Sequence, residues 1–205
     1  MEGKEGQQFD PEILNFPNDR QNLVVEIGTG GPATIMLREI PGHLEENDAN
    51  YLGIESDALG HKKFTDFVEN PSRNIDYAKE AHASVFDVAG QLSSKADAVW
   101  VRNFRGLGMK KDSVLEDKIA SAAYEMLKPG GELMLINTYD ILPAGGIEKV
   151  EESLKSAGFN VELIDLENDT HPFVAGYKRR DEEADKQMPP IPGPSFGYAG
   201  AANRN

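Results

Sequence analysis

The chain has 205 residues and a formal net charge of −14 at pH 7, with 39% hydrophobic and 27% charged residues, which predicts one globular domain with its own core. It contains no cysteine, which excludes disulfides and cysteine-ligated metal sites, and its negative charge disfavours an extended nucleic-acid surface because phosphates would be repelled. No apolar run approaches the ~20 residues of a membrane helix and the charged start lacks the apolar stretch of a signal peptide, so we expect a cytoplasmic protein without membrane association.

Taken in chain order, the pattern predicts strands that alternate with helices. A polar lead-in (1–21) precedes a single domain (22–178), and a Pro/Gly-rich tail (179–205) has a composition typical of disorder. Apolar runs predict strands at 23–27, 51–55, 83–86, 98–101, 131–136, 161–166 and 173–177. Helical spacing predicts helices at 33–44, 57–68, 112–127 and 146–156, with a polar loop at 43–50; Asp57 is the candidate N-cap of the second helix and Gly158 ends the last.

This alternation predicts an α/β fold with a doubly wound, mostly parallel sheet. The last two strands are joined by residues 167–172 alone, with no helix between them. So short a connection favours an antiparallel hairpin.

The most informative segment is the first strand and the turn that follows it. An apolar run containing Glu26 leads into Gly28-Thr-Gly30-Gly, and Pro32 then opens a helical stretch. A strand, a glycine turn and a helix present backbone N–H groups to a ligand. A buried glutamate is costly without a polar partner, so Glu26 is expected to meet one in the loop or in a ligand.

Glu26-Ile-Gly28-Thr-Gly30 resembles the first motif of class I S-adenosylmethionine-dependent methyltransferases, with Pro32 at the place of the motif's third glycine. Three later segments resemble that family in the same order: Tyr-Leu-Gly-Ile-Glu at 51–55, Val-Phe-Asp at 85–87 and Leu-Lys-Pro-Gly-Gly-Glu-Leu at 127–133. The resemblance implies a Rossmann-like methyltransferase fold, with a seven-stranded sheet ending in an antiparallel hairpin, and S-adenosyl-L-methionine as the cofactor.

The resemblance also implies roles for individual residues. Glu55 would bind the ribose hydroxyls and Asp87 the adenine amino group, and Phe86 or Val88 would pack on the adenine ring. Glu26 would organise the loop and meet the methionine amino group. The other expected cofactor-binding residues are Gly28, Thr29, Gly30, Ser56 and Asn103. From the residues alone, a solvated carboxylate at a strand end is the alternative interpretation of Glu55, and a helix cap is that of Asp87.

The loop after the fourth strand is where the resemblance places the methyl acceptor. It lacks the Asp/Asn-Pro-Pro-aromatic tetrad of many amino-methylating members, but it carries four basic residues and no acid between 102 and 111. These charges suit an anionic acceptor, or they are simply solvated at a helix start. The expected substrate residues are Arg102, Phe104, Arg105, Lys110 and Tyr139.

Asp140 and His171 are the candidates for a catalytic base, which is needed only if the acceptor must lose a proton. His61 and His82 stand apart in the sequence, and no set of side chains has metal-ligand spacing, so no metal is expected.

Three alternatives stay open. Four segments have a weaker similarity to tRNA (guanine-N7)-methyltransferases: Val25-Glu-Ile-Gly28, Tyr51-Leu-Gly-Ile-Glu55, Asn103-Phe104 with the lysines that follow, and Asn137-Thr-Tyr-Asp140. That family's Asp-Pro-Trp-Pro segment and its cluster of His, Arg and Lys are missing. The glycine turn matches the Gly-x-Gly-x-x-Ala pattern of NAD-type dinucleotide enzymes as well. A methyltransferase-like binding protein without catalysis would share the fold. The acceptor, whether small molecule, protein or RNA, and the oligomeric state stay open.

Overall fold

The computed structural model describes residues 9–29, 41–70, 72–73, 75–102, 113–136, 146–164 and 173–178. Its strands are β1 (Asn22–Ile27), β2 (Ala49–Glu55), β3 (Ala78–His82), β4 (Ala96–Arg102), β5 (Leu127–Ile136), β6 (Phe159–Ile164) and β7 (Phe173–Lys178). Its helices are η1 (Pro11–Leu14), α2 (Pro41–Glu46), α3 (Ala58–Val68), α4 (Val85–Val88), η2 (Ala89–Leu92), α5 (Ser113–Met126) and α6 (Gly146–Ala157).

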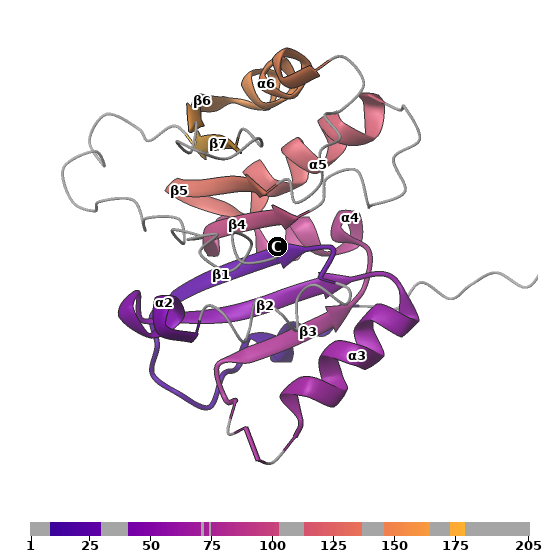
Figure 1. The fold of residues 1–205 in the computed structure, drawn as a ribbon, viewed down its shortest axis with the longest axis vertical. Helices are drawn as coiled ribbons and strands as arrows, with labels where there is room; N and C mark the ends of the chain where they lie inside the picture. The colour runs from indigo at the N-terminus through magenta and orange to yellow at the C-terminus, as the bar shows by residue number, and fades with distance from the viewer. Residues whose placement is uncertain are drawn as a thin grey trace, which may run out of the picture.

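The strands form one sheet in the order β3-β2-β1-β4-β5-β7-β6 (Figure 1). The parallel part comprises the five strands from β3 to β5, whose ladders are all parallel. Beyond it, β7 pairs antiparallel with both β5 and β6. The prediction of a doubly wound, Rossmann-like α/β fold is confirmed.

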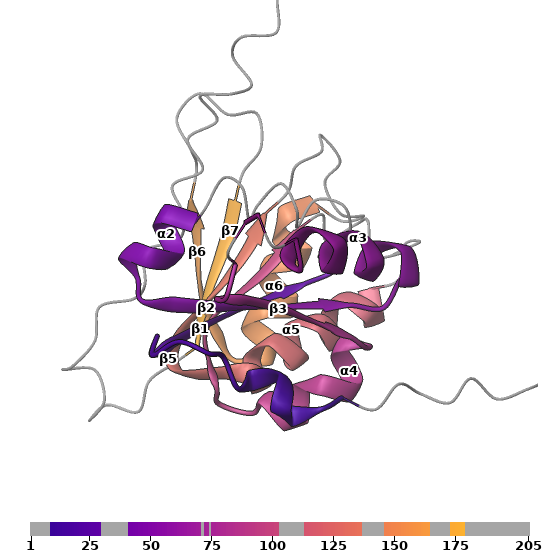
Figure 2. The same cartoon turned by 90° about the horizontal axis from the view of Figure 1, so that it is seen from below.

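Helices cover both faces of the sheet, so the molecule has three layers (Figure 2). On one face α2 and α3 pack against a cluster of large side chains that includes Tyr51, Phe64 and Trp100. On the other face α4, α5 and α6 cover an aliphatic cluster built around Val25, Leu52 and other strand residues. Such two-sided burial explains why the central strands are almost continuously apolar.

Two helix boundaries follow from residues that the sequence singled out. Asp57 caps α3, because its carboxylate accepts a hydrogen bond from the Gly60 amide at 2.8 Å. Gly158 follows α6 with a φ of 103°, a conformation that favours glycine and ends the helix. Both predictions are confirmed.

The predicted third strand was wrong in position. Residues 83–86 do not form a strand: β3 ends at His82, and Val85–Val88 form α4, for which Ser84 is the N-cap through a bond from the Phe86 amide at 3.3 Å. The true strand was missed because it reads Ala-Lys-Glu-Ala-His and is not an apolar run. The predicted loop at 43–50 is also wrong in part, since α2 and the start of β2 fall within it.

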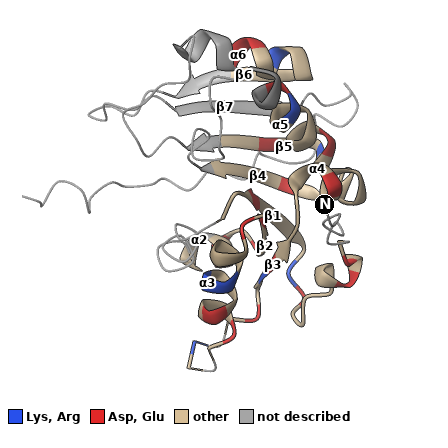
Figure 3. Cartoon of the chain, turned by 90° about the vertical axis from the view of Figure 1, so that its right-hand side faces the viewer, with Lys and Arg blue, Asp and Glu red and all other residues tan. Residues whose placement is uncertain are grey.

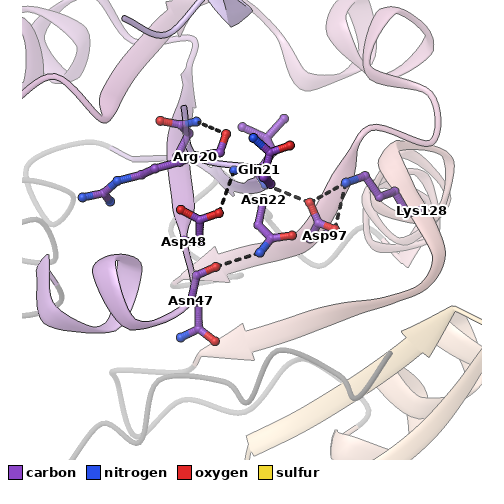
Figure 4. Close-up of polar contacts among 9 residues, drawn as sticks. Arg20, Gln21, Asn22, Asn47, Asp48, Asp97 and Lys128 are labelled. Carbon is purple, nitrogen blue, oxygen red and sulfur yellow. Dashed lines mark hydrogen bonds and ion pairs between the residues drawn. The ribbon is translucent and has the colours of Figure 1, made fainter. Parts of the chain in front are cut away.

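The amino-terminal edge of the sheet is closed by polar contacts (Figure 4). Asp97 at the start of β4 accepts the Leu23 amide at 2.8 Å and the Lys128 ammonium at 2.7 Å. The Asn22 side chain donates to the Asn47 carbonyl oxygen at 2.7 Å. These bonds tie the entry of β1 to its neighbours on both sides.

The lead-in contributes to the fold over the part that the structure describes. Phe9 is buried in the aliphatic cluster, and the Arg20 guanidinium donates to the Ala49 carbonyl oxygen at 2.9 Å. No helix among the described residues is long and apolar enough to cross a membrane. The tail from 179 onward and the predicted helical stretch 33–40 lie outside the described residues.

Candidate functional site

The carboxyl ends of β1, β2 and β3 meet at one edge of the sheet. Gly28 follows β1 with a φ of 74°, which favours glycine, and its amide donates to the Ile54 carbonyl oxygen at 2.9 Å. The Ala83 amide donates to the Glu55 carbonyl oxygen at 3.0 Å in the same way. The structure thus brings the glycine turn and the acid of β2 side by side, as the sequence predicted, at the edge where open α/β sheets bind ligands.

Glu55, the last residue of β2, is buried although its side chain carries a carboxyl group. It is 7% exposed, and one carboxylate oxygen accepts the Asp57 amide at 2.7 Å. This contact fixes the side chain at the strand end, whereas the following Ser56 is exposed.

A row of residues on the α3 face runs across three strands just behind this edge. Glu26 pairs with Gly53, and Gly53 pairs with Glu80, so both acids project from the same face with glycine between them. Glu26 is 0% exposed and accepts a hydrogen bond from the Tyr51 hydroxyl at 2.5 Å. The expected polar partner of this buried glutamate therefore includes a tyrosine of the neighbouring strand.

Thr29, the middle residue of the glycine motif, turns into the protein. It is 0% exposed, and its hydroxyl donates to the Glu80 carboxyl group. Its methyl group lies over Gly53, where an added Cβ would come within 2.5 Å. The side chain of Thr29 is thus directed into the protein, against β2 and β3.

Glu80 has a second partner on α3. Its other oxygen lies 2.7 Å from His61 Nδ1, and the His61 ring stacks on His82 with centroids 4.7 Å apart. Burial raises the pKa of Glu80 to about 8; the Thr29 hydrogen bond opposes the shift, and the charges of Glu55 and Glu26 add to it.

The partner histidine shifts in the direction that keeps it neutral. Burial and then the neighbouring His82 lower the pKa of His61 below its usual 6.5. A protonated Glu80 and a neutral His61 can share one hydrogen bond at near-neutral pH, with the carboxyl proton directed at Nδ1. Neither residue was predicted for the site, because nothing near Glu80 in the sequence marks it and His61 carries no motif.

Phe86 and Asp87 lie on α4, not at a strand end. Phe86 is 46% exposed and lines a shallow groove of about 320 Å³ together with residues of α5 such as Lys118 and Ser121. The helix-cap interpretation of Asp87 is wrong, because Ser84 is the cap. The contacts predicted for Asp87 with the adenine amino group and for Phe86 with the adenine ring stay predictions.

The acceptor side of the site falls largely outside the described residues. Arg102 ends β4 and marks where that loop begins. The predicted site residues outside the described residues are Gly30, Asn103, Phe104, Arg105, Lys110, Tyr139, Asp140 and His171.

Charges on the described helices are mixed, with acidic and basic residues in neighbouring turns (Figure 3). Lys62 pairs with Asp66 on α3, and Lys155 with Glu151 on α6. These pairs are solvent-exposed, so they add little stability. Within the described ranges, no three His, Asp or Glu side chains are grouped so as to hold a metal ion.

No protein-family model and no curated protein matches the chain. Solved structures do match. An antibiotic-resistance methyltransferase, Kmr, aligns with 78% of this chain and 87% of its own at 15% identity and a TM-score of 0.58. A SAM-dependent methyltransferase from Methanosarcina mazei aligns with 85% of this chain and 100% of its own at 14% identity and a TM-score of 0.59.

A third match is geranyl diphosphate C-methyltransferase from Streptomyces coelicolor A3(2), solved with S-adenosyl-L-homocysteine. It aligns with 78% of this chain and 70% of its own at 12% identity and a TM-score of 0.59. The chain has the fold of these methyltransferases. Their acceptors differ, so the fold does not determine one, and these three structures give no support to the similarity with tRNA (guanine-N7)-methyltransferases.

Proposed function

We propose that this protein is an S-adenosylmethionine-dependent methyltransferase. The observation that carries the proposal is the junction of β1 and β2, where the Gly28 turn is bonded to Ile54 and lies beside the buried Glu55. A glycine turn offers backbone N–H groups, and a carboxylate at the next strand end accepts hydrogen bonds from a pair of ribose hydroxyls. This arrangement fits a nucleoside-containing cofactor.

The bound cofactor would supply an electrophilic methyl group on a sulfonium. Transfer to an acceptor is an in-line displacement, so the protein's main task is to align the two partners. Glu55 would hold the ribose, and the turn after β1 would face the methionine part. Asp140 or His171 would accept a proton where the acceptor must lose one.

The basic residues between 102 and 111 support an anionic acceptor, either a small molecule or RNA. In a chain with a net charge of −14, they would be a local region of opposite sign next to the end of β4. Such guanidinium and ammonium groups bind phosphate or carboxylate groups well.

The test is calorimetric titration with S-adenosyl-L-homocysteine, with NAD as the competing ligand. We expect binding of the first and none of the second. Glu55→Ala should weaken that binding by ~1–3 kcal/mol, the size of one or two hydrogen bonds to a charged group. Glu151→Ala on α6, a half-exposed glutamate on a helix that packs against β6, is the matched control and should change nothing.

Two results would favour other functions. Binding of NAD alone would support a dinucleotide enzyme. Binding of S-adenosyl-L-homocysteine without methyl transfer to any anionic acceptor tested would support a binding protein that lacks catalysis.

A further inference from the structure

Resting on the proposed cofactor site, we infer that Glu80 is a positioning residue: from β3 it holds Thr29, and with it the glycine turn, in the conformation that binds the cofactor. Glu80 belongs to no sequence motif. Thr29, the middle residue of the Gly-Thr-Gly turn, contributes to this role through a side chain that faces the interior of the protein.

Thr29 and Glu80 are in direct contact. Thr29 is fully buried and its hydroxyl bonds to Glu80, which is 51 residues away in the sequence. A buried hydroxyl needs a partner, so this bond selects one rotamer of Thr29 and one position of the chain that leaves β1. Because Thr29 lies directly after Gly28, the turn is held at both of its first two residues.

Gly53 leaves the space that admits Thr29. The residue between the two acids in the row across the sheet is Gly53, and a Cβ there would lie 2.5 Å from the Thr29 methyl group and 3.2 Å from the Glu80 Cγ. A glycine in a strand interior commonly marks a close approach by another group. Here the group is the threonine of the turn.

Glu80 is also held from α3. His61 Nδ1 lies 2.7 Å from the second carboxyl oxygen, and the side chain of Glu80 is 1% exposed. With both oxygens engaged, the carboxyl group cannot rotate without breaking one bond. The lock therefore comprises Gly53, Thr29, Glu80 and His61, drawn from β2, the turn, β3 and α3.

The experiment compares variants of the full chain by titration with S-adenosyl-L-homocysteine. Thr29→Val keeps the shape and removes the hydroxyl, while Glu80→Met keeps the length and removes both acceptors. Each should weaken binding by about five- to tenfold. Glu80→Gln retains an oxygen for Thr29 and offers an N–H to His61, so it should stay within about twofold of the wild type.

Two further variants separate positioning from a general loss of stability. Gly53→Ala removes no polar group but must displace Thr29, and it should weaken binding as Thr29→Val does. Asp97→Asn alters a buried acid at the opposite edge of the sheet, and it should lower the melting temperature without changing affinity. Equal losses in Asp97→Asn and Glu80→Met would overturn the inference.

The double variant Thr29→Val/Glu80→Met tests whether the two residues act together. If they do, its affinity for S-adenosyl-L-homocysteine is no more than about twofold below that of the single variant with the lower affinity. A fold-loss of affinity equal to the product of the two single fold-losses would refute the lock.

Amide hydrogen exchange of the segment 24–29 without ligand gives an independent measurement. Exchange should accelerate in Glu80→Met and not in Glu80→Gln. If the wild type bound no S-adenosyl-L-homocysteine, the cofactor proposal and the positioning role would fall, whereas unchanged exchange in Glu80→Met would refute the lock itself.

Discussion

The buried acid on β3 predicts how the stability of the protein depends on pH. The pKa of Glu80 is raised from its usual 4.5 to about 8 in the folded chain, so the folded state binds one more proton than the unfolded state between these two values. The stabilisation by this proton is complete below pH 4.5 and is lost as pH rises through 8. The free energy of unfolding should therefore fall across that window because of this residue.

The size of the effect follows from linkage. A single proton taken up on folding changes the free energy of unfolding by up to ~1.4 kcal/mol per pH unit. The groups that face Glu80 are Thr29, His61, Glu55 and Glu26, and burial contributes more to the shift than the two acids do. Glu80→Gln mimics the protonated form in shape and does not titrate, so the variant should lack this slope.

The assay is urea denaturation of the wild type and Glu80→Gln at pH values from 6.5 to 9. We expect the stability of the variant relative to the wild type to increase with pH and to level off above about pH 8. Below pH 6.5 His61 has the opposite effect on the free energy of unfolding, in the wild type and in the variant. Because its pKa is lowered in the folded state, the stability that it contributes is present above pH 6.5 and is lost as the pH falls below that value.

A matched substitution checks the interpretation. Glu151→Gln on α6 removes a glutamate whose side chain is 42% exposed and should leave the pH profile of the wild type unchanged. Parallel profiles of the wild type and Glu80→Gln, at equal m-values, would refute the protonated, buried state of Glu80.

Three other perturbations follow from the structure. Asp97→Ala removes the acceptor of the half-buried Leu23 amide and of the Lys128 ammonium, and denaturant titration should show a loss of ~2–4 kcal/mol in the free energy of unfolding. Gly158→Ala places a Cβ at a φ of 103° and 3.1 Å from the Tyr124 ring, so thermal unfolding should show a loss of at least ~1 kcal/mol. Arg105→Glu with Lys110→Glu should leave binding of S-adenosyl-L-homocysteine intact and abolish methylation of an anionic acceptor, which a methyl-transfer assay would measure.

The sequence predicts well those parts of the fold whose signals are local. Apolar runs gave the central strands, an aspartate in the capping position gave the start of α3, and Gly158 gave the end of α6. The prediction missed β3 because its sequence, Ala-Lys-Glu-Ala-His, contains neither an apolar run nor a turn signal. Its burial comes from packing against α3 and pairing with β2, tertiary contacts that the five residues of the strand do not themselves indicate.

Local sequence signals likewise indicate some residues of the candidate site and not others. Gly28 and Glu55 could be predicted because each sits at the end of an apolar strand, where chain direction alone brings them to one edge. Thr29 was expected at the cofactor from its place in the motif, yet its side chain faces Glu80. That pairing depends on the register of three strands and on a glycine between them, which no pattern along the chain reveals.

Buried acids have different partners at the two edges of the sheet, and this difference supports a site at the carboxyl edge. At the amino edge Asp97 is paired with Lys128, so its charge is balanced within the fold. At the carboxyl edge Glu26, Glu55 and Glu80 are all buried, and Glu80 is held by a hydroxyl and an imidazole, which leaves its charge unfavourable at neutral pH. Folding alone gives no reason to gather three acids behind a glycine turn, because Glu55 and Glu26 add to the cost of charging Glu80. Proteins tolerate such local conflicts mainly where function requires them. The acids therefore indicate the same edge as the methyltransferase fold does, on grounds that do not depend on any relative.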